Sequence, residues 1–258
     1  MNTSQNQRTE LDNIDIIGGT PDKNDKTPIN KYNFSRRKSL LKTLFKFVPS
    51  RDRLLDSGCS KGSYCEFFRS EGFREIYGLD LSRQRAAIAL EQEYDSVLVG
   101  RGQETPFPDR YFDVVVNQEV LVNVLQHNDR LAMVRESYRV LKKGGIYIIS
   151  FPSLEGRKTI SMFNRLFLVN RVKALKDRLT NAGEKKNDPS VYCCHPSASE
   201  MEEVLLKAGF EIQERLGHLY YYPEALSRMV SILKLIDSLL YQKLPYHCSV
   251  TYIMSRKP

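Results

Sequence analysis

The sequence predicts an α/β fold, in which a doubly wound, mostly parallel sheet of seven strands is covered by helices on both faces. One observation and one general rule of chain topology predict it. Short runs rich in Val, Ile and Leu alternate with stretches of helical length and periodicity, which is the pattern of consecutive βαβ units. Connections between parallel strands are right-handed, and this handedness distributes the helices over both faces of the sheet.

The first regular element that we expect is a helix beginning near Tyr32, because apolar residues recur there at helical spacing until Pro49 closes it. Seven strands follow, at 53–56, 75–80, 96–99, 112–117, 146–151, 210–214 and 247–254. Helices are expected between them, at 62–71, 83–93, 129–141, 199–208 and 223–241. A turn at 143–145, which contains two glycines, precedes the fifth strand.

The composition is that of a globular protein, with 41% hydrophobic and 27% charged residues, and it excludes wholesale disorder, collagen-like repeats and a coiled coil. No apolar run approaches the roughly 20 residues of a membrane-spanning helix. The polar N-terminus lacks the apolar stretch of a secretory signal, so we expect a cytoplasmic protein. The five cysteines are odd in number and irregularly spaced, which favours reduced thiols and no metal site.

The formal net charge of +8 is unevenly distributed along the chain. Residues 1–50 carry four more Lys and Arg than Asp and Glu, residues 151–190 carry five more, and the remainder is close to neutral. We therefore distinguish an N-terminal arm and helix (1–50) and a basic insertion (152–192) from the main fold. These regions are suited to an anionic substrate, nucleic acid or a membrane surface, and a solvated surface explains them equally well.

A nucleoside-binding pattern follows the first predicted strand. Residues 56–62, DSGCSKG, place small side chains between a strand and a helix, where backbone must approach a ligand closely. Asp80 lies 24 residues after Asp56, at the end of the second strand, where a carboxylate accepts hydrogen bonds from both hydroxyls of a ribose. An ordinary strand-to-helix turn is the alternative explanation.

Four motifs occur in order: LDSGCSKG at 55–62, YGLDLS at 77–82, TPFPD and FDVV within 105–115, and VLKKGG at 140–145. They resemble the motifs of class I S-adenosylmethionine-dependent methyltransferases of the methyltransferase domain 11 type, a group similar to the quinone-biosynthesis C-methyltransferases. The resemblance covers residues 53–151 and implies a Rossmann-like methyltransferase domain at 51–258. It implies S-adenosyl-L-methionine as the cofactor and S-adenosyl-L-homocysteine as the product.

The resemblance also assigns cofactor contacts. By this resemblance, the glycine loop binds the methionine part of the cofactor and the end of the second strand binds the ribose. The loop after the third strand binds the adenine, and the end of the fourth strand faces the methyl group. The residues are Asp56, Gly58, Cys59, Ser60, Gly62, Asp80, Leu81, Gly102, Gln103 and Asn117. Ser60 replaces the family's middle glycine, which is tolerable if the backbone keeps φ negative or the side chain turns away. Arg101 replaces the usual adenine-binding acid.

Methyl transfer depends chiefly on aligning the acceptor with the methyl group and excluding water. A hydroxyl or ammonium acceptor must also lose a proton, which a positioned base assists. The candidate bases are His195, His218, His127 and Glu119. Each histidine is alternatively a surface or packing residue, and Glu119 is alternatively a ligand for a cationic group of the substrate.

We therefore expect an enzyme that methylates an oxygen or nitrogen of a small-molecule acceptor, such as a sugar or a secondary-metabolite precursor. The arm and the insertion would close over this acceptor. The two basic regions favour an alternative, an RNA (tRNA) methyltransferase. Ser60 and Arg101 suggest a further alternative, a catalytically silent partner protein with the same fold.

Overall fold

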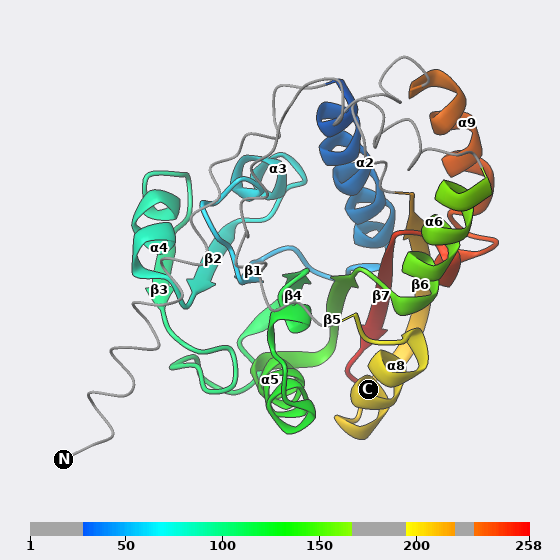
Figure 1. Ribbon diagram of the computed structural model, residues 1–258. Coiled ribbons are helices and arrows are strands. Elements are labelled where there is room, and N and C mark those ends of the chain that lie inside the picture. Colours follow the sequence, from blue (N-terminus) through cyan, green and yellow to red (C-terminus); the bar gives the residue numbers. More distant parts are fainter. Residues whose placement is uncertain (1–27, 167–194, 220–229) are drawn as a thin grey trace, which may run out of the picture.

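A single seven-stranded sheet organises the computed structural model, which describes residues 28–166, 195–219 and 230–258 (Figure 1). Its order is β3-β2-β1-β4-β5-β7-β6. The strands are β1 (Arg53–Ser57), β2 (Glu75–Asp80), β3 (Ser96–Val99), β4 (Phe112–Gln118), β5 (Leu141–Phe151), β6 (Glu211–His218) and β7 (Val250–Arg256). The first five pair in parallel, and β7 runs antiparallel between β5 and β6. The predicted fold class is confirmed.

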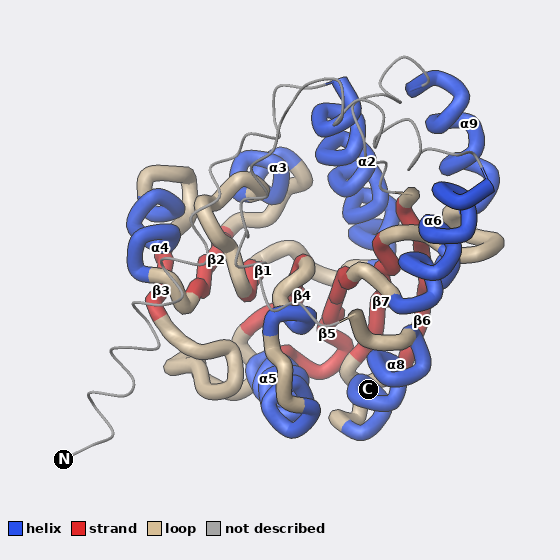
Figure 2. Tube along the Cα trace, viewed as in Figure 1, coloured by secondary structure: helices blue, strands red, loops and turns tan. Residues whose placement is uncertain are grey.

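Helices cover both faces of this sheet (Figure 2). The helices are α2 (Pro28–Leu44), α3 (Cys65–Ser70), α4 (Arg83–Leu90), α5 (His127–Val140), α6 (Leu154–Leu166), α8 (Ala198–Lys207) and α9 (Val230–Leu240). Short 3-10 turns lie at η1 (Phe45–Phe47), η2 (Leu121–Asn123) and η4 (Pro245–His247). The helices α2 and α3 pack on one face, and α5 and α8 pack on the other.

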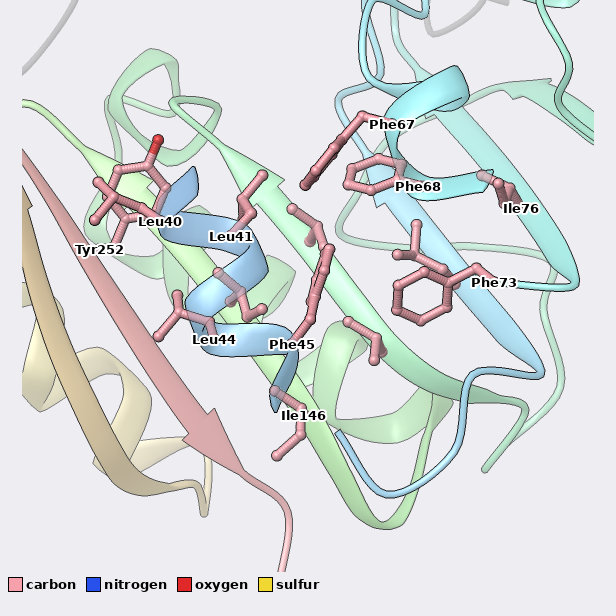
Figure 3. Close-up of a cluster of buried hydrophobic side chains, with 14 of the residues drawn as sticks. Leu40, Leu41, Leu44, Phe45, Phe67, Phe68, Phe73, Ile76, Ile146 and Tyr252 are labelled. Carbon is pink, nitrogen blue, oxygen red and sulfur yellow. The ribbon is translucent and has the colours of Figure 1, made fainter. Parts of the chain in front are cut away.

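The helix α2 is part of the core. Its buried leucines, Leu40, Leu41 and Leu44, pack with Phe45 against the aromatic residues of α3 and against Ile146 and Tyr252 of the sheet (Figure 3). Burying a leucine side chain contributes roughly 1.5–3 kcal/mol. This packing fixes α2 above the sheet, and Arg37 of α2 reaches Glu119, just past the carboxyl end of β4.

Several predicted boundaries were wrong. The strand β5 begins at Leu141 because the predicted turn is an irregular part of the strand: Gly144 adopts φ +77° and its N–H donates to the Lys257 carbonyl at 2.8 Å. The register against β4 shifts at the same place. In β6 the pairing continues to His218, four residues beyond the predicted end. The predicted start of the last strand is instead the 3-10 turn η4.

Helix boundaries also differ from expectation. The helix α3 starts at Cys65, because the residues after β1 form an extended loop, and α5 starts at His127. The arm residues 1–27, insertion residues 167–192 and positions 223–229 of the predicted late helix lie outside the described residues. Within the described ranges, no helix combines the length and apolarity needed to cross a bilayer.

Candidate active site

The carboxyl ends of the parallel strands meet at one edge of the sheet, which is where open α/β sheets bind ligands. The loop after β1 lies there and requires glycine. Gly58 adopts φ +88°, and a Cβ at this position would lie 2.1 Å from Cγ2 of Val120. The N–H groups of Gly58 and Cys59 donate to the Leu79 carbonyl at 2.6 and 3.0 Å, which ties the loop to β2. Gly62 also has a positive φ, +81°.

The first of the two conditions that would make serine tolerable at position 60 is not met. The φ of Ser60 is +49°, in the left-handed region, and not negative. A side chain in the left-handed region costs roughly 1–2 kcal/mol. The Ser60 N–H donates to Oδ2 of Asp80 at 2.8 Å, and this bond holds the strained residue in place.

Asp80 is the last residue of β2 and is 8% exposed. Its Oδ2 accepts from Ser60 N and its Oδ1 accepts from Ser82 N at 2.9 Å. A carboxylate has about four acceptor positions, so both oxygens keep capacity for two further donors. The arrangement fits the two hydroxyls of a ribose. Leu81 follows directly and is half-buried.

Asp56 lies beneath the loop rather than on its surface. It is buried, and its Oδ2 accepts a hydrogen bond from the Tyr94 hydroxyl at 2.7 Å. Burial raises the pKa of Asp56 to about 7, and the nearby charge of Asp80 adds to the rise against the lowering by the Tyr94 bond. Cys59 is a buried free thiol whose pKa is raised by burial.

The end of β4 presents amide side chains that the described part of the chain leaves without hydrogen bonds. Asn117 is fully buried, and neither its Nδ2 nor its Oδ1 has a partner among the described residues. The Nε2 and Oε1 atoms of Gln118 are likewise buried without partners. Unpartnered buried polar atoms are costly, so such groups call for a ligand or water. Asn117 and the Asp80 carboxylate therefore fit a nucleoside bound at this edge.

Glu119 connects this strand end to α2. Its backbone adopts φ +56°, and its N–H donates to the Ser150 carbonyl at 2.9 Å. The carboxylate lies 2.6 Å from the Arg37 guanidinium. Arg37 in turn lowers the pKa of Tyr64, although burial dominates and raises that pKa to about 12.

His218 is the last residue of β6 and is fully buried. Its Nδ1 lies 3.6 Å from Oδ1 of Asp237 in α9. Burial lowers the pKa of the His218 imidazole, against the effect of Asp237, and Arg37 and Arg36 lower it further. The imidazole is therefore neutral at neutral pH, the form that accepts a proton.

Asp237, in α9, binds residues of the N-terminal helix α2 next to His218. Its Oδ2 accepts from the Tyr32 hydroxyl at 3.1 Å and from Nε of Arg36, and its Oδ1 accepts from Leu219 N at 2.9 Å. Burial acts to raise the pKa of Asp237, but the interactions with His218, Leu219 N and Arg36 hold it below the usual range. We call the polar side chains that meet beneath α2 the α2 cluster; they are Tyr32, Arg36, Arg37, Glu119, His218 and Asp237.

The structure brings together two of the four candidate bases, His218 and Glu119, within the α2 cluster. His127 lies elsewhere, at the first residue of α5, where its side chain is 40% exposed and its Nδ1 is 3.8 Å from Oε1 of Glu200 in α8. His195 is half-buried just before the N-cap of α8. Sequence reasoning missed Arg37 and Asp237; the detectable signal was that Asp237 is the only acidic residue in a largely apolar helix.

The predicted adenine contacts lie in the loop after β3. Gly102 and Gln103 are half-buried there. A Cβ on Gly102 would clash with the Met133 side chain, whose Cε would lie 2.4 Å away. Gln103 lines a groove of about 450 Å³ on α5, together with residues such as Leu131 and Arg135. Adenine recognition by this loop stays a prediction. Cys193 and Cys194 lie outside the described residues, and within the described ones no group of three potential metal ligands is clustered.

Comparison with known proteins decides which fold family this site belongs to. The family model for a methyltransferase domain matches residues 55–149. The chain carries a class I S-adenosylmethionine-dependent methyltransferase domain. A relative from Mycolicibacterium smegmatis, named a probable S-adenosylmethionine-dependent methyltransferase, is 28% identical over 72% of this chain and 62% of its own length. A Mycobacterium tuberculosis relative of the same description is 29% identical over 48% of this chain and 44% of its own length.

Solved structures share the methyltransferase fold. A structure of an S-adenosylmethionine-dependent methyltransferase from Mesorhizobium loti has a TM-score of 0.55 at 17% identity, covering 83% of this chain and 95% of its own. A protein from Pyrococcus horikoshii has a TM-score of 0.56 at 19% identity, covering 91% and 95%. The chain spans about three fifths to two thirds of the curated relatives that it matches over the greatest length. S-adenosylmethionine is the cofactor of the domain. That the glycine loop, Asp80 and Asn117 bind it stays a prediction.

Proposed function

We propose that this protein transfers a methyl group from S-adenosylmethionine to an oxygen or nitrogen atom of a small metabolite that binds beneath α2. The observation that carries the proposal is the buried His218–Asp237 pair, which lies in the same cluster as the Glu119 end of β4. A neutral imidazole beside a carboxylate is suited to removing a proton from a hydroxyl or ammonium group.

Each part of the site has a role in this reaction. When bound, S-adenosylmethionine supplies an electrophilic methyl group on its sulfonium sulfur. The glycine loop and Asp80 hold the nucleoside, and Asn117 and Gln118 offer amide groups at the strand end. The helix α2 covers this end and limits access of water, which favours in-line transfer. Asp237 orients the His218 ring and stabilises the imidazolium that forms when Nε2 or Nδ1 takes a proton.

Incubation of the purified protein with a metabolite extract and isotopically labelled methyl donor tests the proposal. We expect mass spectrometry to detect a labelled small molecule with the methyl group on oxygen or nitrogen. His218→Gln should lower kcat by roughly 10²-fold or more, whereas the affinity for S-adenosylhomocysteine should stay unchanged. His127→Gln is the matched control and should retain activity. Labelling of carbon, or of no small molecule, would contradict the proposal.

Transfer to tRNA is the second candidate. A relative from Arabidopsis thaliana, named a tRNA (carboxymethyluridine(34)-5-O)-methyltransferase, is 29% identical over 43% of this chain. A structural neighbour from Haloferax volcanii was solved in complex with the methyltransferase activator Trm112, with a TM-score of 0.55. The basic residues of 1–50 and 151–190 also support this candidate. Salt-dependent binding of tRNA and labelling of tRNA in the same assay would favour it over a metabolite.

A silent protein with this fold is the remaining candidate, and Ser60 is its motivation. The structural neighbour SpnF, which is named a cyclase, shares the fold with a TM-score of 0.55. Calorimetry with S-adenosylhomocysteine separates the cases, because a protein that has lost the cofactor site would show no saturable heat.

A further inference from the structure

The helix α9 buries its acidic residue and exposes two of its leucines. Ordinary surface helices turn their apolar side toward the protein and their charged side toward water. In α9 the acidic residue, Asp237, is fully buried and bound to Tyr32 and Arg36, whereas Leu235 and Leu239 are 62% and 56% exposed. Leu244, just past the helix, is 46% exposed. Three leucines therefore face solvent, beside the exposed Ser231, Lys234 and Ser238 of α9, and we call these leucines the stripe.

This stripe differs from the scattered exposed leucines elsewhere in the described part of the chain. Leu90 and Leu206, for example, lie on separate helices, α4 and α8. Leu235 and Leu239 lie one turn apart on the same helix face, with Leu244 following. Single exposed leucines are normal on a protein surface, but contiguous ones mark an interaction site.

The charges beside the stripe are positive. Lys234 and Lys243 are exposed, and between residues 230 and 246 the only acidic residue is the buried Asp237. The helix α6, which contacts η4, carries exposed Arg157 and Lys158. The whole chain has a formal charge of +8. A second copy of the chain would bring positive surfaces together, whereas an anionic apolar surface is complementary to both features.

We propose that α9 docks the protein onto an anionic lipid membrane. With 11 residues the helix is too short to span a bilayer, so it lies in the plane of the interface. The leucines Leu235, Leu239 and Leu244 enter the boundary between headgroups and acyl chains, and Lys243 contacts lipid phosphates. The Lys234 ammonium lies 5.5 Å from the centre of the Tyr32 ring, so this residue adds positive charge without a direct phosphate contact. This inference stands independently of the proposed methyl acceptor.

Co-sedimentation of the full-length protein with vesicles tests the docking. We expect binding to vesicles of equimolar phosphatidylcholine and phosphatidylglycerol, much weaker binding to pure phosphatidylcholine, and weakening by salt. The double variant Leu235→Ser/Leu239→Ser should lose roughly tenfold or more of the partition coefficient. The double variant Leu90→Ser/Leu206→Ser is the control, because those leucines are 61% and 58% exposed on other helices.

Binding of S-adenosylhomocysteine by each variant, measured by calorimetry, confirms that the fold is intact and keeps this test separate from that of the enzyme activity. The proposal is overturned if the wild-type protein stays in the supernatant with both vesicle types, or if the two double variants lose binding equally. Sedimentation velocity supplies a third decisive outcome. If the wild type forms a dimer that Leu235→Ser/Leu239→Ser abolishes, the stripe is a subunit interface and the membrane proposal is wrong.

Discussion

The Arg37 guanidinium lies 2.6 Å from the Glu119 carboxylate, and this ion pair joins the N-terminal helix α2 to the carboxyl end of β4. The two side chains are 19% and 31% exposed, so the pair is largely shielded from water. Glu119 also holds a strained backbone, with φ +56°. The ion pair thus holds α2 at the end of β4, where the methyl acceptor is proposed to bind.

Removing the charge of Arg37 should destabilise the protein. Arg37→Met leaves the Glu119 carboxylate shielded without its partner, which we expect to cost about 1–3 kcal/mol, less than for a fully buried pair because water still reaches both groups. Chemical denaturation measures the free energy of unfolding. The exposed pair between Lys207 and Glu203, whose side chains are 51% and 56% exposed, provides the control. Lys207→Met should change the free energy of unfolding by less than about 0.5 kcal/mol. If both variants lose the same stability, the Arg37–Glu119 pair contributes no more than an exposed ion pair.

Asp80 should dominate recognition of the cofactor's ribose. Asp80→Ala removes both acceptor oxygens, and we expect the dissociation constant of S-adenosylhomocysteine to rise by at least about tenfold, the loss of roughly one charged hydrogen bond. Isothermal titration calorimetry measures it. Asp52→Ala is the control, because Asp52 is an exposed acid at the opposite, amino-terminal edge of the sheet. Unchanged affinity in a folded Asp80→Ala protein would refute the assignment.

The sheet, the glycine loop after β1 and the position of Asp80 at the end of β2 could be predicted because their signals are local. Strand runs, the glycine loop and Asp80 lie within segments of a few residues whose spacing reflects their geometry. The β5 boundary was missed because Gly144 and Gly145 are typical of a turn, whereas here the positive φ of Gly144 allows a bulge within a strand.

The α2 cluster could not be predicted, because its contacts join distant parts of the chain. Tyr32 and Asp237 are 205 residues apart in sequence. Helical periodicity identified α2 and α9 as packing elements, and it contains no information on which polar residues meet across the fold. Only tertiary structure shows that Asp237 points inward while its leucine neighbours point outward.

Replacing Ser60 with glycine should stabilise the protein. The φ of +49° strains the backbone of serine but not that of glycine. Glycine also raises the conformational entropy of the unfolded chain, which offsets part of the gain in stability. We expect Ser60→Gly to raise the free energy of unfolding by about 0.5–1 kcal/mol. Ser63→Gly, in the same loop but with an ordinary φ, should instead lower it. A loss of stability in Ser60→Gly would mean that the Ser60 side chain contributes contacts that outweigh the backbone strain.

Asp56 should make stability fall as pH rises from about 4 to about 7. Its folded pKa is raised to about 7, mainly by burial, above the ordinary value near 4. Below both values the carboxyl is protonated in the folded and the unfolded chain. Between pH 4 and pH 7 only the unfolded chain releases this proton. The contribution of Asp56 to the free energy of unfolding therefore decreases as the pH rises, and it stays constant above about pH 7.

Asp56→Asn removes this titration while keeping an acceptor for the Tyr94 hydroxyl. The melting temperature of the variant relative to wild type, measured without cofactor, should therefore increase from pH 4 to 7 and level off above. Asp95 supplies a control of opposite sign. Burial acts to raise the pKa of Asp95, but bonds from Ile76 N and Arg69 lower it below the ordinary value. Asp95→Asn should thus be most harmful at neutral pH and least harmful in acid, so parallel pH profiles for the two variants would contradict the assignment of a raised pKa to Asp56.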